Sequence, residues 1–99
     1  MTPEQLAEKQ RKRRELALRD VLNTQAGRDF FWDVLERAGL HSGSFSTEAL
    51  AMAFNEGRRS VALDIAGDAQ RVCPELYMQS LRERLDAEAQ RLRDANKGG

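Results

Sequence analysis

The sequence predicts an all-α protein, with a small core of about four helices and extended polar helices at its N- and C-terminal ends. Most of the 99 residues are strong helix formers such as Leu, Ala, Glu, Gln and Arg. β-branched residues are few, and no stretch alternates apolar and polar side chains as a half-buried strand would. The apolar residues recur instead at the three- and four-residue spacing of a helix face.

The first expected helix runs from Pro3 to about Leu22. Thr2 can cap its N-terminus, and Pro3 suits the first helical position. Its first half is polar, and residues 9–14 contain no apolar side chain. Because this half cannot bury an apolar face by itself, residues 1–20 are predicted to form a polar, basic N-terminal arm.

Residues 21–81 are predicted to form the helical core domain. Asn23 and Thr24 interrupt the first helix and offer a new cap. A second helix is expected over residues 25–38, and Gly39 is a natural C-terminal stop.

A third helix is expected from about Thr47 to Val72, after a loop over residues 40–46. Phe45 is placed to form a hydrophobic staple at its start. Gly57 and Gly67 lie inside this helix, where each costs about 1 kcal/mol relative to Ala, so close approach of a neighbouring helix at Gly57 is the simplest explanation. The side chains expected to fill the core are Phe30, Phe31, Phe45, Leu50, Phe54, Val61 and Ile65.

The last helix is expected to begin at Pro74, because the residue before a proline, Cys73, is pushed out of helical geometry. It should run to about Ala95. Its apolar residues recur at heptad-like spacing: Met78, Leu81, Leu85 and Leu92. Residues 82–99 are therefore predicted to form a C-terminal helical extension.

Composition limits the functional classes. The net charge is zero, so no overall attraction to nucleic acid or an anionic membrane follows. Residues 1–20 carry six basic and four acidic groups, residues 21–81 five and eight, and residues 82–99 five and four. No apolar run is long enough to cross a membrane, and the N-terminus lacks an apolar signal core. One cysteine, Cys73, permits no internal disulfide, which suits a reducing cytosol.

No group of residues points to catalysis, so the chain is expected not to be an enzyme and to need no cofactor or metal. His41, the only histidine, lies in a Ser/Gly loop without ligand partners at suitable spacing. It is interpreted as a surface residue. Cys73 is interpreted as a small buried hydrophobe.

Two polar clusters are candidates for binding a partner. The first is a basic run near the N-terminus: Arg11, Lys12, Arg13 and Arg14. It fits contact with phosphates or with an acidic protein groove, and it also fits a solvated helix face. The second surrounds Gly57: Asn55, Glu56, Arg58 and Arg59. It fits an internal clamp between helices as well as a partner-facing patch, for which the planar, multi-donor head of arginine is suited.

Four pieces of sequence follow one another in a fixed order along the chain. They are Val21-Leu22-Asn23-Thr24-x-Ala26-Gly27-Arg28-x-Phe30-x-Trp32, Leu35-Glu36-x-Ala38-Gly39, Ser44-Phe45 and Ala53-Phe54-Asn55-Glu56-Gly57-Arg58-Arg59. Together they resemble a family of small structural proteins of short-tailed bacteriophages, encoded among the head and portal genes. The resemblance covers about residues 20–80, and the first and last helices carry no part of it.

The resemblance implies a non-enzymatic virion or head-assembly protein, present in several copies. Such a protein would bind the portal, the head–tail vertex or the head interior through its helices, in the virion and, during assembly, in the host cytoplasm. Its expected partners are portal or head proteins, and DNA contact through the basic N-terminal helix is a further expectation. Two alternatives stay open. A nucleic-acid-binding packaging factor would join Arg11–Arg14 and Arg58–Arg59 in one basic face, and a scaffold-like factor would be absent from mature particles.

Overall fold

The computed structural model describes residues 1–40 and 48–98, which contain four α-helices and no strand. The helices are α1 (Pro3–Leu22), α2 (Gln25–Arg37), α3 (Ala49–Val72) and α4 (Pro74–Lys97). The predicted all-α class is confirmed. His41 and the staple predicted for Phe45 lie outside the described residues.

Local sequence signals account for most helix ends. Thr2 forms a capping box with Gln5: the Gln5 backbone N–H donates to the Thr2 hydroxyl, and the Gln5 side chain accepts from the Thr2 backbone N–H. The Thr24 hydroxyl accepts from the backbone N–H of Gly27 at 3.0 Å and so caps α2. Gly39 follows α2 with φ of 85°, which glycine adopts without strain. The caps predicted at Thr2 and Thr24 and the stop at Gly39 are therefore confirmed.

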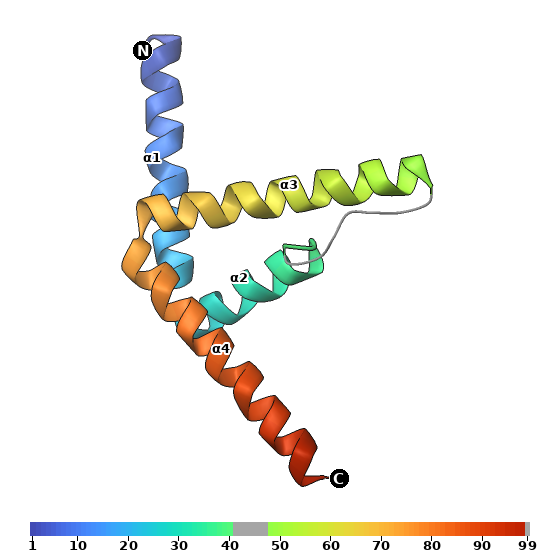
Figure 1. Ribbon diagram of the computed structural model, residues 1–99. Helices are drawn as coiled ribbons and strands as arrows, with labels where there is room; N and C mark the ends of the chain where they lie inside the picture. Colours follow the sequence, from blue (N-terminus) through green and yellow to red (C-terminus); the bar gives the residue numbers. More distant parts are fainter. Residues whose placement is uncertain (41–47, 99) are drawn as a thin grey trace.

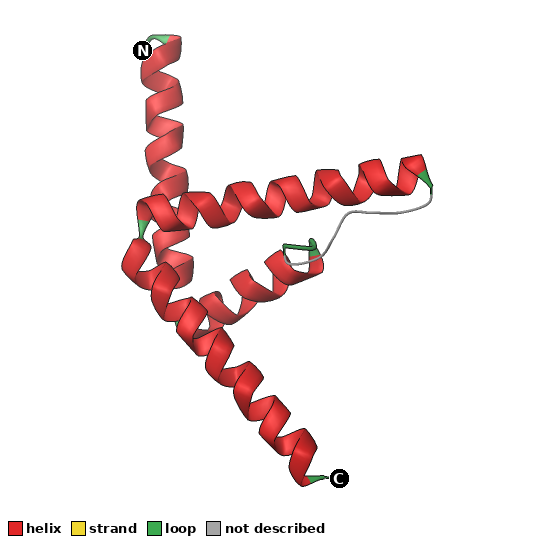
Figure 2. Cartoon of the chain, in the orientation of Figure 1, coloured by secondary structure: helices red, strands yellow, loops and turns green. Residues whose placement is uncertain are grey.

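The four helices meet at one junction and then diverge (Figure 1). The N-terminal part of α1, the N-terminal half of α3 and the C-terminal part of α4 each run outward from it, and all regular structure is helical (Figure 2). The molecule measures 63 × 38 × 17 Å and has a radius of gyration of 17.0 Å. A compact domain of this length has a radius of about 13 Å. The molecule is therefore thin and extended, and much of its helix surface packs against no other helix of residues 1–40 and 48–98.

A single apolar cluster holds the junction together. α1 and α2 supply large side chains, whereas α3 supplies mainly alanines, so that α3 can pack closely against its neighbours. The buried members are Leu22, Phe31, Trp32, Leu35, Leu40, Ala62, Ala66, Ala69, Val72, Cys73 and Tyr77. Cys73 is buried as predicted, and this burial raises the pKa of its thiol.

Most of the predicted core is wrong. Phe31 is buried and Ile65 packs at the edge of the cluster, but Phe30, Leu50, Phe54 and Val61 are 66%, 79%, 67% and 57% exposed. Phe30 is exposed because α2 buries the side that carries Arg28, Trp32 and Leu35. For Leu50, Phe54 and Val61, the physical reason is the alanine stripe of α3. The prediction assigned the face with the largest apolar residues to the interior, whereas the buried face is the one with the smallest.

The prediction of a close helix approach at Gly57 is also wrong. A Cβ atom added to Gly57 or Gly67 would have nothing from another part of the described chain within 4 Å. The close approach occurs at Gly27, where a Cβ atom would lie 1.7 Å from the carbonyl oxygen of Val21. Gly27 therefore permits the tight passage from α1 into α2.

The last turns of α1 belong to the junction rather than to a free arm. Leu22 is fully buried, and Leu18 packs against the apolar cluster. The Arg19 guanidinium donates to the backbone carbonyl of Val72 at the end of α3, at 3.0 Å. Glu15 also faces α3, because its carboxylate lies 3.8 Å from the Arg71 guanidinium, so the part of α1 that projects freely is the first half of the helix.

Candidate interaction surfaces

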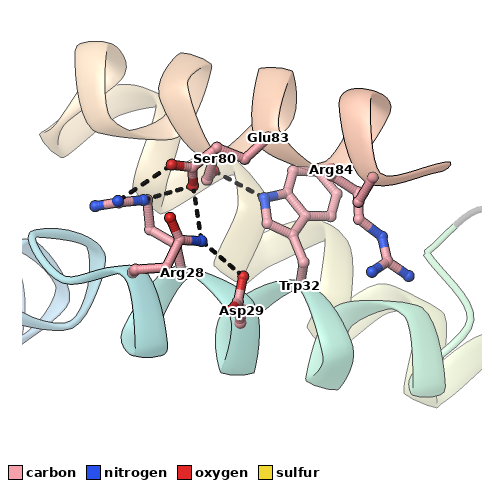
Figure 3. A pocket seen from close by; sticks show the side chains of 8 residues that line it. Arg28, Asp29, Trp32, Ser80, Glu83 and Arg84 are labelled. Carbon is pink, nitrogen blue, oxygen red and sulfur yellow. Dashed lines mark hydrogen bonds and ion pairs between the residues drawn. The ribbon is translucent and has the colours of Figure 1, made fainter. Parts of the chain in front are cut away.

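A polar junction fixes α4 across α2 (Figure 3). The Arg28 guanidinium donates from Nε to Glu83 Oε1 at 2.7 Å and from Nη2 to Glu83 Oε2 at 3.1 Å. Its third contact is from Nη1 to the carbonyl oxygen of Leu22, at 3.0 Å. Arg28 is buried, and such paired, charge-assisted hydrogen bonds satisfy a buried guanidinium well. Arg28 thus ties α4 to the α1–α2 turn.

Trp32 provides the apolar part of the same junction. Its indole N–H donates to the Ser80 hydroxyl at 2.8 Å, and that hydroxyl donates to the carbonyl of Tyr77 at 2.7 Å. The indole ring meets Phe31 edge-on and lies 5.8 Å from the ring of Tyr77. The ring of the buried indole is therefore packed against aromatic neighbours, and its N–H group has a hydrogen-bond acceptor.

The shallow pocket at this junction does not have the properties of a ligand site. Its polar groups are already bonded to one another: Gln25 donates to Asp29 and Glu83, and Arg84 pairs with Glu36. No group of three or more His, Cys, Asp or Glu residues that could hold a metal occurs in the described ranges. The junction is therefore structural, and its role is to set the direction in which α4 projects.

Glu83 makes this junction sensitive to acid. The hydrogen bonds from Arg28 hold the pKa of Glu83 below its ordinary value, which is about 4.3. A carboxylate with a lowered pKa in the folded state stabilises the fold above its unfolded-state pKa, and this contribution disappears as the pH falls through the folded-state pKa. We expect the melting temperature, followed by circular dichroism, to decrease when the pH is lowered below about 4.

This decrease in melting temperature should be smaller in Glu83→Gln. Asp86→Asn, at an exposed site on the same helix, is the control and should show the same decrease as the unmodified chain. If the melting temperature of Glu83→Gln depends on pH as that of the unmodified chain does, Glu83 is not the source of the acid sensitivity.

The outer face of α3 is an apolar stripe that no other described helix covers. We define it as Leu50, Phe54, Gly57 and Val61, whose spacing of four, three and four residues places them on one side of the helix. All four are exposed. This stripe is the part of α3 that carries large apolar side chains without packing them inside the described chain.

The cluster around Gly57 lies beside this face. Arg58 donates to the carbonyl oxygen of Arg37 at 3.1 Å and to Asn55 Oδ1 at 3.1 Å, and its guanidinium lies 5.3 Å from the centre of the Phe54 ring. The Arg37 carbonyl is at the negative end of the α2 dipole, which favours a cation there. Arg58 and Asn55 thus connect α3 to the end of α2, as the clamp interpretation requires, while Arg58 and Phe54 remain exposed to a partner.

Glu56 and Arg59 complete the cluster without forming a strong internal contact. Their closest charged atoms are 3.9 Å apart. The Arg59 Nε atom is buried and has no hydrogen-bond partner in the part of the chain that the structure describes. The Glu56 side chain is exposed, and about half of its surface is open to solvent.

The basic run on α1 is partly neutralised along its own helix. Arg11 donates to Glu8 at 3.0 Å through Nε and to Glu15 at 2.6 Å, and the hydrogen bond from Arg11 lowers the pKa of Glu8. Lys12 lies 4.0 Å from Glu8, whereas Arg13 and Arg14 form no ion pair with any residue described by the structure. Such i to i+3 and i+4 pairs stabilise an isolated helix, which explains how this arm can be helical without a packing partner.

Sequence reasoning missed the roles of Arg28, Ser80 and Glu83. Arg28 appeared only as a member of the motif string, and Ser80 and Glu83 were not singled out. The sequence did contain one signal for Arg28. Arg28, Trp32 and Leu35 are four and three residues apart, so they share one face of α2. A charged residue therefore lies on the apolar face of this helix. A buried arginine needs a carboxylate partner, but the sequence could not say that α4 would supply it.

These features define a class of protein: a thin all-α molecule in which one junction joins the four helices, helix segments project from it, and one apolar face of α3 is left exposed by the described chain. The model of the family described as Bbp19-like phage protein matches residues 18–82, and the chain belongs to this family. The predicted phage family is thereby confirmed. The matched segment runs from the first α1 residue at the junction into α4. No curated protein and no solved structure matches the chain. No described helix is both long and apolar enough to span a membrane.

Proposed function

We propose that this phage protein is a non-enzymatic component of the virion or of head assembly, and that it binds a portal or head protein through its helices. The observation that carries the proposal is the outer face of α3, which lies within the family-matched segment and is uncovered. A small soluble protein rarely leaves such a stripe open unless a partner covers it. Several copies would act together in an assembly.

The shape of the molecule supports the same role. Arg28 and Trp32 tie α4 to α2, and three helix segments project from the shared apolar cluster in different directions, so separate surfaces can touch separate neighbours (Figure 1). The polar arms carry their own ion pairs, whereas the outer face of α3 is apolar. We therefore assign protein binding to α3.

A nucleic-acid-binding role in packaging has less support. It would need the basic run on α1 and the arginines of α3 to form one face. The basic run of α1 instead lies near the C-terminal end of α3, whereas Arg58 and Arg59 lie in the half of α3 that projects away from the junction (Figure 1). In addition, Arg11 is paired with two glutamates, and Arg58 is held at the end of α2. If the protein binds nucleic acid, the charges favour contact with DNA through Arg13 and Arg14.

Mass spectrometry of purified virions, combined with cross-linking, tests the proposal. The protein is expected in mature particles, with cross-links from the outer face of α3 to a portal or head protein. Cross-links from α1 to packaged DNA alone would favour the nucleic-acid role. Absence from mature particles, together with presence in immature heads, would favour the scaffold-like role and contradict a virion component.

Arg58→Ala tests the cluster around Gly57. The variant loses two exposed hydrogen bonds, so we expect a decrease of only about 1 kcal/mol in the free energy of unfolding and an unchanged helical circular dichroism signal. Incorporation into particles, measured by quantitative immunoblotting, should nevertheless fall. Arg37→Ala is the control, because the Arg37 carbonyl that Arg58 contacts is retained. Loss of helical signal in Arg58→Ala would mean that the cluster acts as an internal clamp alone.

A further inference from the structure

The positive charge of the chain is concentrated near its N-terminus, in residues 1–14, which we call the basic segment. The basic segment carries five basic side chains and two acidic ones, so its formal charge is +3, and the remaining residues carry −3 because the whole chain is neutral. All residues of the segment are exposed, and the first half of α1 projects from the junction (Figure 1). The positive charge therefore lies on a surface that is open to a partner.

The five basic residues of this segment fall into two groups. Arg11 and Lys12 have glutamates three or four positions away and contact them. Lys9, Arg13 and Arg14 have no acidic residue at those positions, and none of the three forms an ion pair with a described residue. We call these three residues the unpaired cations.

The unpaired cations lie on the side of α1 opposite its glutamates. Glu4, Glu8 and Glu15 are spaced by four and seven residues, which places them on one stripe of the helix. At about 3.6 residues per turn, the unpaired cations fall within an arc of about 140° on the other side. Residues 1–19 place no carboxylate in this arc, so the basic segment does not neutralise its own cationic side.

Like charges at these spacings destabilise the segment. Lys9 and Arg13 are four residues apart, and Arg11 and Arg14 are three apart, so the members of each pair repel one another along the helix. The first half of α1 packs on no other described helix that could offset this repulsion. A polyanion lying against the cationic side would replace the repulsion by attraction.

The composition of this side favours phosphates over an acidic protein. Residues 9–14 contain no apolar side chain, whereas protein interfaces enclose an apolar core within a polar rim. Binding to a nucleic-acid backbone needs only positive charge, because it is driven by the release of counterions from the phosphates. The basic segment also lacks aromatic side chains, on which proteins stack the bases of single strands. Duplex DNA is therefore the partner that fits this side.

The cationic side ends at the cleft between α1 and α3, which Arg14 lines together with Arg11 and Arg71. Two carboxylates, Glu15 and Asp68, line the cleft as well. Arg11 pairs with the first of them, and Arg71 lies close to both. The charges inside the cleft are thus largely neutralised within the chain, and the DNA contact is limited to the unpaired cations.

We propose that the basic segment binds the backbone of duplex DNA through Lys9, Arg13 and Arg14, without reading the base sequence. The three cations replace counterions at about three phosphates. The contact requires no arginine of α3 and is separate from the protein contact assigned to the outer face of α3, because the two surfaces lie on different helices. One copy binds weakly through three charges, and several copies in an assembly add their contacts.

Fluorescence anisotropy of a short labelled duplex, titrated with the full-length chain at several salt concentrations, tests this contact. With three phosphates, the logarithm of the association constant should fall with the logarithm of the salt concentration with a slope of about −2.7, so that each doubling of the salt weakens binding about sixfold. Arg13→Gln should reduce the size of this slope by about 1. Replacing all three unpaired cations with Gln should abolish binding.

Lys12→Gln is the matched control, because it removes the same charge from a position that contacts Glu8. This variant should keep the salt dependence of the unmodified chain. All the substituted positions are exposed, so the helical circular dichroism signal and the melting temperature should be retained in every variant.

Several results would overturn the proposal. Absence of binding at low salt would show that the basic segment is only a solvated helix. Equal losses in Lys12→Gln and Arg13→Gln would mean that overall charge, rather than one side of α1, attracts the DNA. Tighter binding of a single strand of equal length, or equal binding of polyglutamate, would assign a different partner. The titration uses only the purified chain and DNA, so its failure is recognised separately from that of the proposed protein contact in the virion.

Discussion

Replacing Trp32 with Ala is expected to lower the free energy of unfolding by about 4 kcal/mol, as is typical of a large buried aromatic side chain. The indole is 3% exposed, contacts the rings of Phe31 and Tyr77, and donates its N–H to Ser80. Its removal leaves a cavity at the point where α2 and α4 meet. Domains of this size have about 5–15 kcal/mol in total, so this loss removes a large share of the stability. Urea unfolding followed by circular dichroism measures the effect.

Phe30→Ala is the matched control for this prediction. Phe30 lies on the same helix but is 66% exposed, so its truncation should change the free energy of unfolding by less than about 1 kcal/mol. Equal losses in the two variants would show that the buried side of α2 has been assigned wrongly. The comparison also separates the junction from the surface that remains free for partners.

The helices themselves could be predicted because their signals are local. Thr2, Thr24 and Gly39 act through backbone atoms no more than a few residues away, so the sequence contains both members of each contact. The exposure of the first half of α1 could also be anticipated, because residues 9–14 contain no apolar side chain. The family resemblance could also be recognised directly in the sequence. The family model matches residues 18–82, in agreement with the expected range of about 20–80.

The buried face of α3 could not be predicted, because two faces of this helix are suited to contact. One face carries Ala62, Ala66 and Ala69 and packs inside the chain; the other carries Leu50, Phe54 and Val61 and remains exposed. Hydrophobicity favours the second face, since a large side chain gains more from burial than an alanine does. A pattern in one sequence does not distinguish burial within the chain from burial against a partner. The error therefore bears on the proposed function, because the most apolar face of α3 is the one that the described chain leaves exposed.

The Arg28–Glu83 pair was missed for a related reason. The two residues are 55 positions apart, and their meeting depends on the angle between α2 and α4. That angle follows from the tight α1–α2 turn and from the kink at Cys73 and Pro74, where the backbone φ of Cys73 is −142°. Long-range geometry of this kind is fixed by packing, whereas the sequence reports only that a buried charge needs a partner.

Gly27→Ala is expected to lower the free energy of unfolding by about 3 kcal/mol, although alanine is the better helix former. A Cβ atom would lie 1.7 Å from the carbonyl oxygen of Val21 and 2.9 Å from the Thr24 hydroxyl. The obstacle is backbone at the end of α1, so α2 itself must move. Such a shift would weaken the Thr24 cap and the hydrogen bond from Arg28 to Leu22 together. The single tryptophan, Trp32, lies on α2, so urea unfolding can be followed by its fluorescence.

Gly57→Ala is the natural counterpart, because it makes the same chemical change in an open position. With no neighbouring part of the described chain within 4 Å of the new Cβ atom, the gain in helix propensity should raise the free energy of unfolding by about 0.5–1 kcal/mol. The two substitutions should therefore change stability in opposite directions. If Gly57→Ala were as destabilising as Gly27→Ala, α3 would be packed on its outer side within the chain, and no surface would remain there for a partner. A stabilised variant that assembles poorly would instead mean that Gly57 is kept for contact with another molecule.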